Sequence, residues 1–171
     1  MPDCRRCPRP ELAFLLPGVS HGHKIPRSVL VVIYTVDLHV LMLERAGWPG
    51  FWQSVTGSVD HENEPLAETA AREVREETGI DASQYPLTDW GIEKRFEIFK
   101  KYRSRYADGV THNWEHVFGL ELPAMVPVRL EPAEHLRYEW LPWKEAAERT
   151  PSWTNRDAIL LLPQKRGAGA S

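Results

Sequence analysis

Three glutamates near residue 75 constrain what this chain can form more than any other feature of its sequence. Glu73, Glu76 and Glu77 follow a loop that contains Gly57. At about 100° per residue they fall within roughly a third of the circumference of a helix. Like charges at positions i and i+4 destabilise an isolated helix. We therefore expect a cation to bind this acidic face, in preference to an acidic face that is merely solvated.

The same segment also contains a candidate core stripe. Its members are Ala67, Ala71, Val74 and Thr78. Their i, i+4, i+7, i+11 spacing is typical of the buried side of an amphipathic helix, so the pattern predicts a core face and a separate, exposed acidic face. Mg²⁺ prefers oxygen ligands and binds through one or two carboxylates together with the phosphate oxygens of a substrate. The helix is therefore a candidate site for metal-assisted phosphate chemistry.

The segment resembles the Nudix box, G-x5-E-x7-R-E-U-x-E-E-x-G-U, where U is a bulky aliphatic residue. The second half of the box is complete, with Arg72, Glu73, Val74, Glu76, Glu77, Gly79 and Ile80. Counting back from Arg72 places the leading glutamate at Glu64, but Ser58 stands where the leading glycine is expected, and Gly57 precedes it. We interpret this departure as a one-residue insertion in the loop at 60–63, upstream of the helix.

Further strings between residues 24 and 160 are similar to the bacterial dihydroneopterin triphosphate pyrophosphatases, a Nudix family of folate synthesis. They include SVLVVIY at 28–34, VLMLER at 40–45, FWQSVTGSV at 51–59, FEIF at 96–99, RYADGVTHNWEHVFGLELP at 105–123, EHLRYEWL at 134–141 and SWTNRDAI at 152–159. The box indicates the chemistry, and these strings indicate the substrate. The resemblance implies a Nudix-type α/β/α sandwich with a mixed sheet and a loop-helix-loop catalytic motif.

The carboxylates and the resemblance together suggest a set of functional residues. We expect Glu73 and Glu77 to hold Mg²⁺, with Mn²⁺ as a substitute ion, and Glu76 to be a third ligand or a base that activates water. Arg72 is expected to fix the loop by pairing with Glu64 rather than to contact substrate. The family's other positions fall on Glu134, as a further metal ligand, and on Lys24, Arg45, Thr56, Phe96, Glu97, Ile98, Phe99 and Ser152, as substrate contacts.

Several of these residues also have a purely structural interpretation. Lys24 and Arg45 could be solvated charges at strand ends, and Ser152 could be a plain helix cap. The phenylalanines at 96 and 99 could belong to the core. They point to opposite faces of a regular strand, so at most one should face a ring of the substrate. Glu134 lies in a segment without strong periodicity, and a structural role is equally open for it.

The expected reaction needs no nucleophilic side chain. A metal that bridges the oxygens of a phosphoric anhydride neutralises charge and lowers the pKa of bound water. The chain has no G-x-S-x-G elbow, and its cysteines stand only at positions 4 and 7. The resemblance implies hydrolysis of dihydroneopterin triphosphate to the monophosphate and pyrophosphate. The alternatives are a housecleaning nucleoside triphosphate pyrophosphatase and a non-catalytic nucleotide-binding Nudix module, against which the intact carboxylates argue.

Length and composition favour one domain, because 171 residues with 42% hydrophobic content can bury one sizeable core. We expect a disordered leader at 1–22, the Nudix domain at 24–163 and a flexible tail at 164–171. In the leader, Cys4 and Cys7 form a lone C-x-x-C, which is weak evidence for zinc even with His21 and His23 as candidate ligands.

Charge and hydropathy exclude two classes of partner. A formal net charge of −3 argues against broad nucleic-acid binding, which needs a basic footprint. No apolar run approaches the ~20 residues that a membrane span requires. We therefore expect a cytoplasmic enzyme with a small-molecule pterin or nucleoside triphosphate substrate, and the oligomeric state stays open.

The sequence also predicts the order of strands and helices. Strands are predicted at 28–36, 39–45, 90–104, 112–121 and 136–141, with a short strand ending at Gly57. Helices are predicted at 65–78, 143–149 and 155–162, and the last begins with a capping-box-like pair, Thr154 and Asp157.

Overall fold

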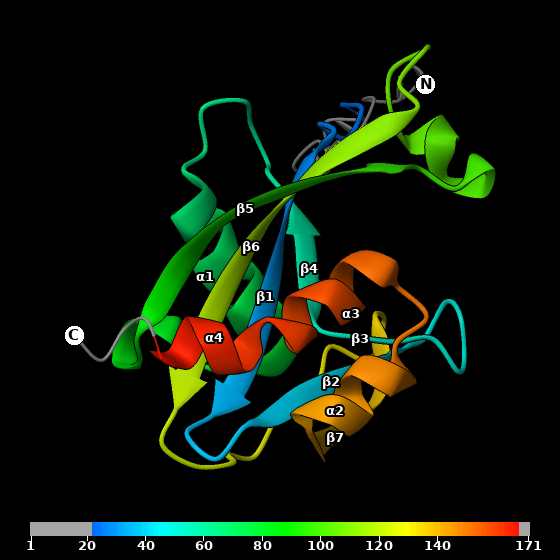
Figure 1. Cartoon of the computed structure of the whole chain (residues 1–171). Coiled ribbons are helices and arrows are strands. Elements are labelled where there is room, and N and C mark those ends of the chain that lie inside the picture. Colours follow the sequence, from blue (N-terminus) through cyan, green and yellow to red (C-terminus); the bar gives the residue numbers. More distant parts are fainter. Residues whose placement is uncertain (1–21, 168–171) are drawn as a thin grey trace, which may run out of the picture.

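Seven strands and four α-helices make up residues 22–167, the part of the chain that the computed structural model describes (Figure 1). The strands are β1 (Arg27–Thr35), β2 (His39–Arg45), β3 (Trp52–Gln53), β4 (Val55–Ser58), β5 (Leu87–Glu97), β6 (His112–Leu122) and β7 (His135–Pro142). The helices are α1 (Leu66–Thr78), α2 (Trp143–Arg149), α3 (Trp153–Leu160) and α4 (Leu162–Gly167), and two short 3₁₀ helices span Ala82–Gln84 and Lys100–Arg105.

The strands form one mixed sheet in the order β3-β2-β1-β6-β5, in which β4 also pairs with β1 and β7 with β2. Only the β1–β6 pair is parallel among these strands. Strand β6 occupies one edge of β1 along its whole length. The other edge is divided, because β4 pairs with residues 28–31 and β2 pairs at Tyr34. The sheet therefore forks beside β1, and strands from both branches meet at the site described below.

Alternation along β1 explains why both faces of the sheet are covered. Side chains of successive strand residues point to opposite faces, so a strand buried on both sides reads as a continuous apolar run. Leu30 and Val32 pack in a core that includes Ala158 and Ile159 of α3. Val29 and Val31 belong to a second core, with residues of α1. Figure 1 shows α1 on one side of the sheet and α3 and α4 on the other, which confirms the predicted α/β/α sandwich.

Two predicted boundaries are wrong. The strand predicted at 90–104 ends at Glu97, and residues 100–105 turn into a 3₁₀ helix in which the Tyr102 N–H donates to the carbonyl of Phe99. The last predicted helix starts earlier, at Trp153, because the Ser152 hydroxyl accepts the N–H of Asn155 and caps it. The predicted cap, Thr154, is a buried residue inside that helix.

The predicted core stripe of α1 is correct in part. Val74 and Thr78 are buried and Ala71 is partly buried against the core, whereas Ala67 is exposed. The buried residues of the helix are Thr69, Ala70, Glu73, Val74, Glu77 and Thr78. The sequence pattern predicted an acidic face separate from the core face, whereas Glu73 and Glu77 are buried because β4 and β7 cover that side of the helix. Gly79, with φ of 72°, ends α1 in the left-handed conformation that glycine adopts readily.

The predictions for the leader, including Cys4, Cys7 and His21 as zinc ligands, lie outside the described residues, as does the chain after Gly167. Helix α4 extends through residues 164–167, within the segment predicted as a flexible tail. Between residues 22 and 167, no helix is both long enough and apolar enough to span a membrane.

Candidate active site

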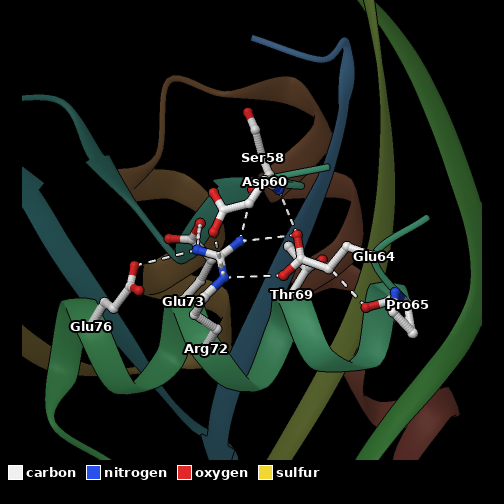
Figure 2. A network of polar contacts seen from close by, with 8 residues as sticks. All are labelled: Ser58, Asp60, Glu64, Pro65, Thr69, Arg72, Glu73 and Glu76. Carbon is white, nitrogen blue, oxygen red and sulfur yellow. Dashed lines mark hydrogen bonds and ion pairs between the residues drawn. The ribbon is translucent and has the colours of Figure 1, made fainter. Parts of the chain in front are cut away.

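Arg72 ties helix α1 to the loop that precedes it (Figure 2). Its Nε donates to Glu64 Oε1 at 3.1 Å, and its Nη2 donates to the carbonyl of Ser58 at 3.0 Å. Glu64 in turn accepts the N–H of Asp60 at 2.5 Å. The pairing expected between Arg72 and Glu64 is therefore present.

Glu73 lies against the backbone of β4. A Cβ atom added to Gly57 would lie 1.8 Å from Glu73 Cδ, so the position tolerates only glycine while this carboxylate keeps its place. Arg72 Nη1 donates to Glu73 Oε1 at 2.8 Å. Only 9% of Glu73 is exposed, and this burial raises the pKa of its carboxyl group to about 7 in spite of the adjacent guanidinium.

Glu77, Glu134 and His135 bring potential metal-ligand atoms within 4.8 Å of one another. Glu77 is 2% exposed, and its Oε2 lies 2.8 Å from His135 Nε2. Burial raises the pKa of Glu77 well above its usual value, and the negative charge of Glu134 raises it further. Burial also lowers the pKa of His135, which favours the neutral imidazole that binds metals. Two carboxylates and an imidazole are a suitable donor set for a divalent cation, whose charge would offset the repulsion between the carboxylates.

His135 was not among the residues expected from the sequence. The only local signal is its position next to Glu134, at the first residue of β7. Strand β7 reaches α1 because it pairs with β2, where His135 lies opposite Arg45. That pairing is a long-range contact, so the periodicity of either segment alone does not reveal it.

Glu76 lies apart from this cluster. Its side chain is exposed, and its Oε2 accepts from Arg72 Nη1 at 3.4 Å. Among the predicted ligands, the structure thus brings Glu77 and Glu134 together and places Glu73 near both Glu77 and Lys24, as their electrostatic coupling indicates.

A cleft of about 930 Å³ opens beside the cluster, a size that suits a small-molecule site. Glu77, Glu134 and His135 line it, together with Gln53 and Thr56 from the strands that form the fork. Every predicted substrate residue also lines it, namely Lys24, Arg45, Thr56, Phe96, Glu97, Ile98, Phe99 and Ser152. The cleft thus combines acidic metal-ligand candidates with cations that can face phosphate groups.

Phe96 and Phe99 do not lie on opposite faces of one strand, as the sequence predicted. Phe96 lies on β5, whereas Phe99 lies beyond the end of the strand, where its ring packs edge-on against Trp48 at 5.7 Å. The rule of opposite strand faces therefore does not apply to Phe99. Ser152 caps α3 and also lines the cleft, so its role as a helix cap leaves the predicted substrate contact open.

Two further polar residues in the cleft wall were missed from the sequence. Asn113 and Glu115 of β6 line the cleft and are 2% and 5% exposed. Burial raises the pKa of Glu115 to about 7, although the Thr154 hydroxyl and the charge of Lys94 act in the opposite direction. One sequence signal could have revealed them. Asn113 and Glu115 are two positions apart on the predicted strand at 112–121, so their polar side chains lie on the same face of that strand.

Comparison with known proteins agrees with this geometry. The NUDIX domain family model matches residues 24–162. A protein of Escherichia coli K12 named dihydroneopterin triphosphate diphosphatase is 50% identical over 140 residues, covering 80% of this chain and 91% of that protein. A protein of the same name from Haemophilus influenzae is 43% identical over 141 residues, covering 80% of this chain and 87% of its own length. The solved structure of the E. coli dihydroneopterin triphosphate pyrophosphohydrolase has a TM-score of 0.74 and 50% identity, and the match covers 81% of this chain and 94% of that one. With Glu77 of the box lining the cleft beside Glu134, and with the family match spanning residues 24–162, this chain belongs to the NUDIX domain family.

Proposed function

We propose that this Nudix hydrolase uses Mg²⁺ to convert dihydroneopterin triphosphate into dihydroneopterin monophosphate and pyrophosphate. The observation that carries the proposal is the cleft that joins buried carboxylates to a row of cations and to a polar inner wall. Relatives with 50% and 43% identity over most of their length bear the name of this activity. The proposal includes a cytoplasmic location and a small-molecule substrate.

In this proposal Glu73, Glu77 and Glu134 hold the metal ion. When bound, Mg²⁺ supplies charge neutralisation at the attacked phosphorus and a bound water of lowered pKa. His135 holds the Glu77 carboxylate in place through the 2.8 Å contact at Nε2. Glu76 stays a candidate for a third ligand or for the base that activates water. Its variants are to be compared with those of Glu73 and Glu77.

The remaining residues position the triphosphate. Burial lowers the pKa of Lys24, and the nearby charges of Glu73 and Glu134 act to raise it. The charge of Arg45 acts to lower the pKa of Glu77. Both cations therefore lie near the metal ligands. A triphosphate bound there would neutralise the cations and leave its organic ring in the rest of the cleft. Arg72 acts through Glu73 and the loop, because its guanidinium is already engaged by Glu64 and Ser58.

The test is product analysis with the purified enzyme, dihydroneopterin triphosphate and Mg²⁺ in ¹⁸O-labelled water. A single in-line displacement should release intact pyrophosphate from the earliest time point, with label in one product at one phosphorus. Orthophosphate appearing first, in the absence of a contaminating pyrophosphatase, would refute the reaction. Mn²⁺ should replace Mg²⁺ in the same assay, whereas Ca²⁺ is the comparison ion with a larger, more flexible coordination shell.

The competing function is a nucleoside triphosphate pyrophosphatase, since pterin and purine rings share a fused bicyclic shape. Comparing kcat/KM for dihydroneopterin triphosphate, dGTP and dATP decides between them. A clear preference for a deoxynucleotide would overturn the proposed substrate while leaving the chemistry in place.

A further inference from the structure

Two buried oxygen atoms in the cleft wall have no hydrogen-bond partner within residues 22–167. They are Oδ1 of Asn113 and Oε1 of Glu115. A buried polar group left unpaired is destabilising, so such groups call for an explanation. Both residues lie on β6, two positions apart, and their side chains therefore point to the same side of the strand. That side is the cleft, which both residues line.

The neighbours of these residues are already engaged with other partners. Lys94, which lies opposite Glu115 on β5, pairs its Nζ with Asp157 at 3.2 Å and lies 5.3 Å from the Trp153 ring centroid. Ser28, beside Glu115 on β1, has its Oγ bonded to Asn113 Nδ2 at 2.6 Å. No ion pair with Lys94 accounts for the buried carboxyl group. The Thr154 hydroxyl also acts on this carboxyl group, but Oε1 is still left without a partner in the described part of the chain.

Another buried amide in the wall of this cleft, that of Asn155, bonds within the chain through both its oxygen and its nitrogen. Asn155 accepts the N–H of Ser54 at 2.8 Å and donates Nδ2 to the Ser54 hydroxyl at 2.9 Å. The chain itself thus supplies a donor for the oxygen of this buried amide. The free acceptors of Asn113 and Glu115 indicate that their partner comes from outside the chain.

We infer that Glu115, assisted by Asn113, reads the heterocycle of the substrate by accepting two adjacent N–H groups from a 2-amino-4-oxo ring edge. This inference rests on the proposed triphosphate hydrolysis in the same cleft and names the group that selects the ring. The edge carries a ring N–H beside an amino group, and a carboxylate can accept both in a bidentate pair. Asn113 Oδ1 accepts a further N–H. Hydrogen bonds to the charged form of a carboxyl group favour ionisation, so such a ligand keeps Glu115 charged even though its surroundings are buried.

This chemistry discriminates between rings. Pterin and guanine share the 2-amino-4-oxo pattern, whereas adenine places its amino group beside an unprotonated ring nitrogen. Against adenine, one carboxylate oxygen would face a lone pair and remain unpaired. A site built to satisfy buried hydrogen-bonding groups rejects a ring that leaves them unpaired.

The substitution that tests the inference is Glu115→Gln, which keeps the shape and replaces two acceptors by one acceptor and one donor. That arrangement matches adenine instead. We expect kcat/KM for dihydroneopterin triphosphate and for dGTP to fall about 10- to 100-fold, as for loss of a bidentate base contact, while dATP is unchanged or improved. Glu121→Gln is the matched control, because Glu121 lies on the same strand and does not line the cleft. It should leave all three substrates unchanged.

The outcomes separate the inference from the proposed function. An equal loss for all three substrates in Glu115→Gln would overturn the inference, since a structural defect does not distinguish rings. The wild-type ranking of the three substrates tests the proposed function independently of this variant. Should Glu115→Gln fold poorly, inhibition by the free nucleosides guanosine and adenosine in Glu115→Asp gives the same reading. Weaker inhibition by guanosine alone supports ring recognition, and equal changes for both nucleosides contradict it.

Discussion

Replacing Gly57 with alanine should abolish most activity while leaving the fold almost intact. The three atoms nearest to the added Cβ, at 1.8, 2.1 and 2.3 Å, all belong to Glu73. Ordinary contact begins near 3.4 Å, so the carboxylate must move by about 1.6 Å. A misplacement of about 1 Å in a reacting constellation lowers the rate about 100-fold, and we expect at least that loss in kcat/KM.

Stability should change much less. The displaced group is the end of a flexible side chain, whose strained rotamer costs about 1 kcal/mol. Alanine in a strand gains up to about 1 kcal/mol relative to glycine, which offsets that cost. The melting temperature of the metal-free protein should therefore stay within about 4 °C of the wild type.

The assay pairs steady-state kinetics with thermal melting and uses Gly22→Ala as a control, since a Cβ atom there meets nothing within 4 Å. A double-mutant cycle tests the contact between Gly57 and Glu73 directly. In a Glu73→Ala background, Gly57→Ala should cause no further loss, because the group it displaces is gone. Additive losses, or wild-type activity in Gly57→Ala itself, would refute the assigned contact.

Three further predictions concern charge, pH and the amino-terminal segment. Glu77→Gln should lower turnover by at least about 100-fold and weaken Mg²⁺ binding measured by calorimetry. Its metal-free melting temperature should not fall, because glutamine keeps an oxygen that can accept from His135 Nε2 and removes the repulsion from Glu134. Near-normal turnover would exclude Glu77 as a ligand. The folded pKa of Glu115 is about 7 against an ordinary value of 4.5, so the stability it contributes is complete below pH 4.5 and is lost as pH rises through 7. In EDTA, the free energy of unfolding of the wild type, measured by urea titration, should decrease between pH 5 and pH 8 by up to about 3 kcal/mol more than that of Glu115→Gln. The same pH dependence in both proteins would contradict the raised pKa of Glu115. Deleting residues 1–22 should leave kcat/KM and melting temperature nearly unchanged, and loss of activity or zinc in stoichiometric amounts in the full chain would show that the leader has a role.

Local patterns in the sequence determined much of this protein. The apolar run at 29–33 predicts a strand buried on both faces, and the structure contains it within β1. The hairpin with β2 follows from strands separated by a short turn, and the Arg72–Glu64 pair follows from the spacing of the box. These features depend on contacts between residues close in sequence, where periodicity and turn chemistry carry the information.

Tertiary structure alone decided what surrounds the carboxylates. The helix pattern predicted an exposed acidic face, yet Glu73 and Glu77 are buried, because β4 and β7 pack over that side of α1. The same holds for His135, which reaches Glu77 only because β7 pairs with β2. These contacts join segments far apart in the chain, so no local periodicity records them.

The inner wall of the cleft has the same origin. Asn113 and Glu115 read in the sequence as ordinary polar positions of a half-buried strand, and only the parallel pairing of β6 with β1 turns them toward the cleft beside Ser28. Whether a polar side chain meets water or a buried cavity depends on what the sheet places opposite it. The sequence by itself thus determined which polar side chains are available. Long-range strand pairing decided which of them are buried, which are hydrogen-bonded within the chain and which remain free to bind a ligand.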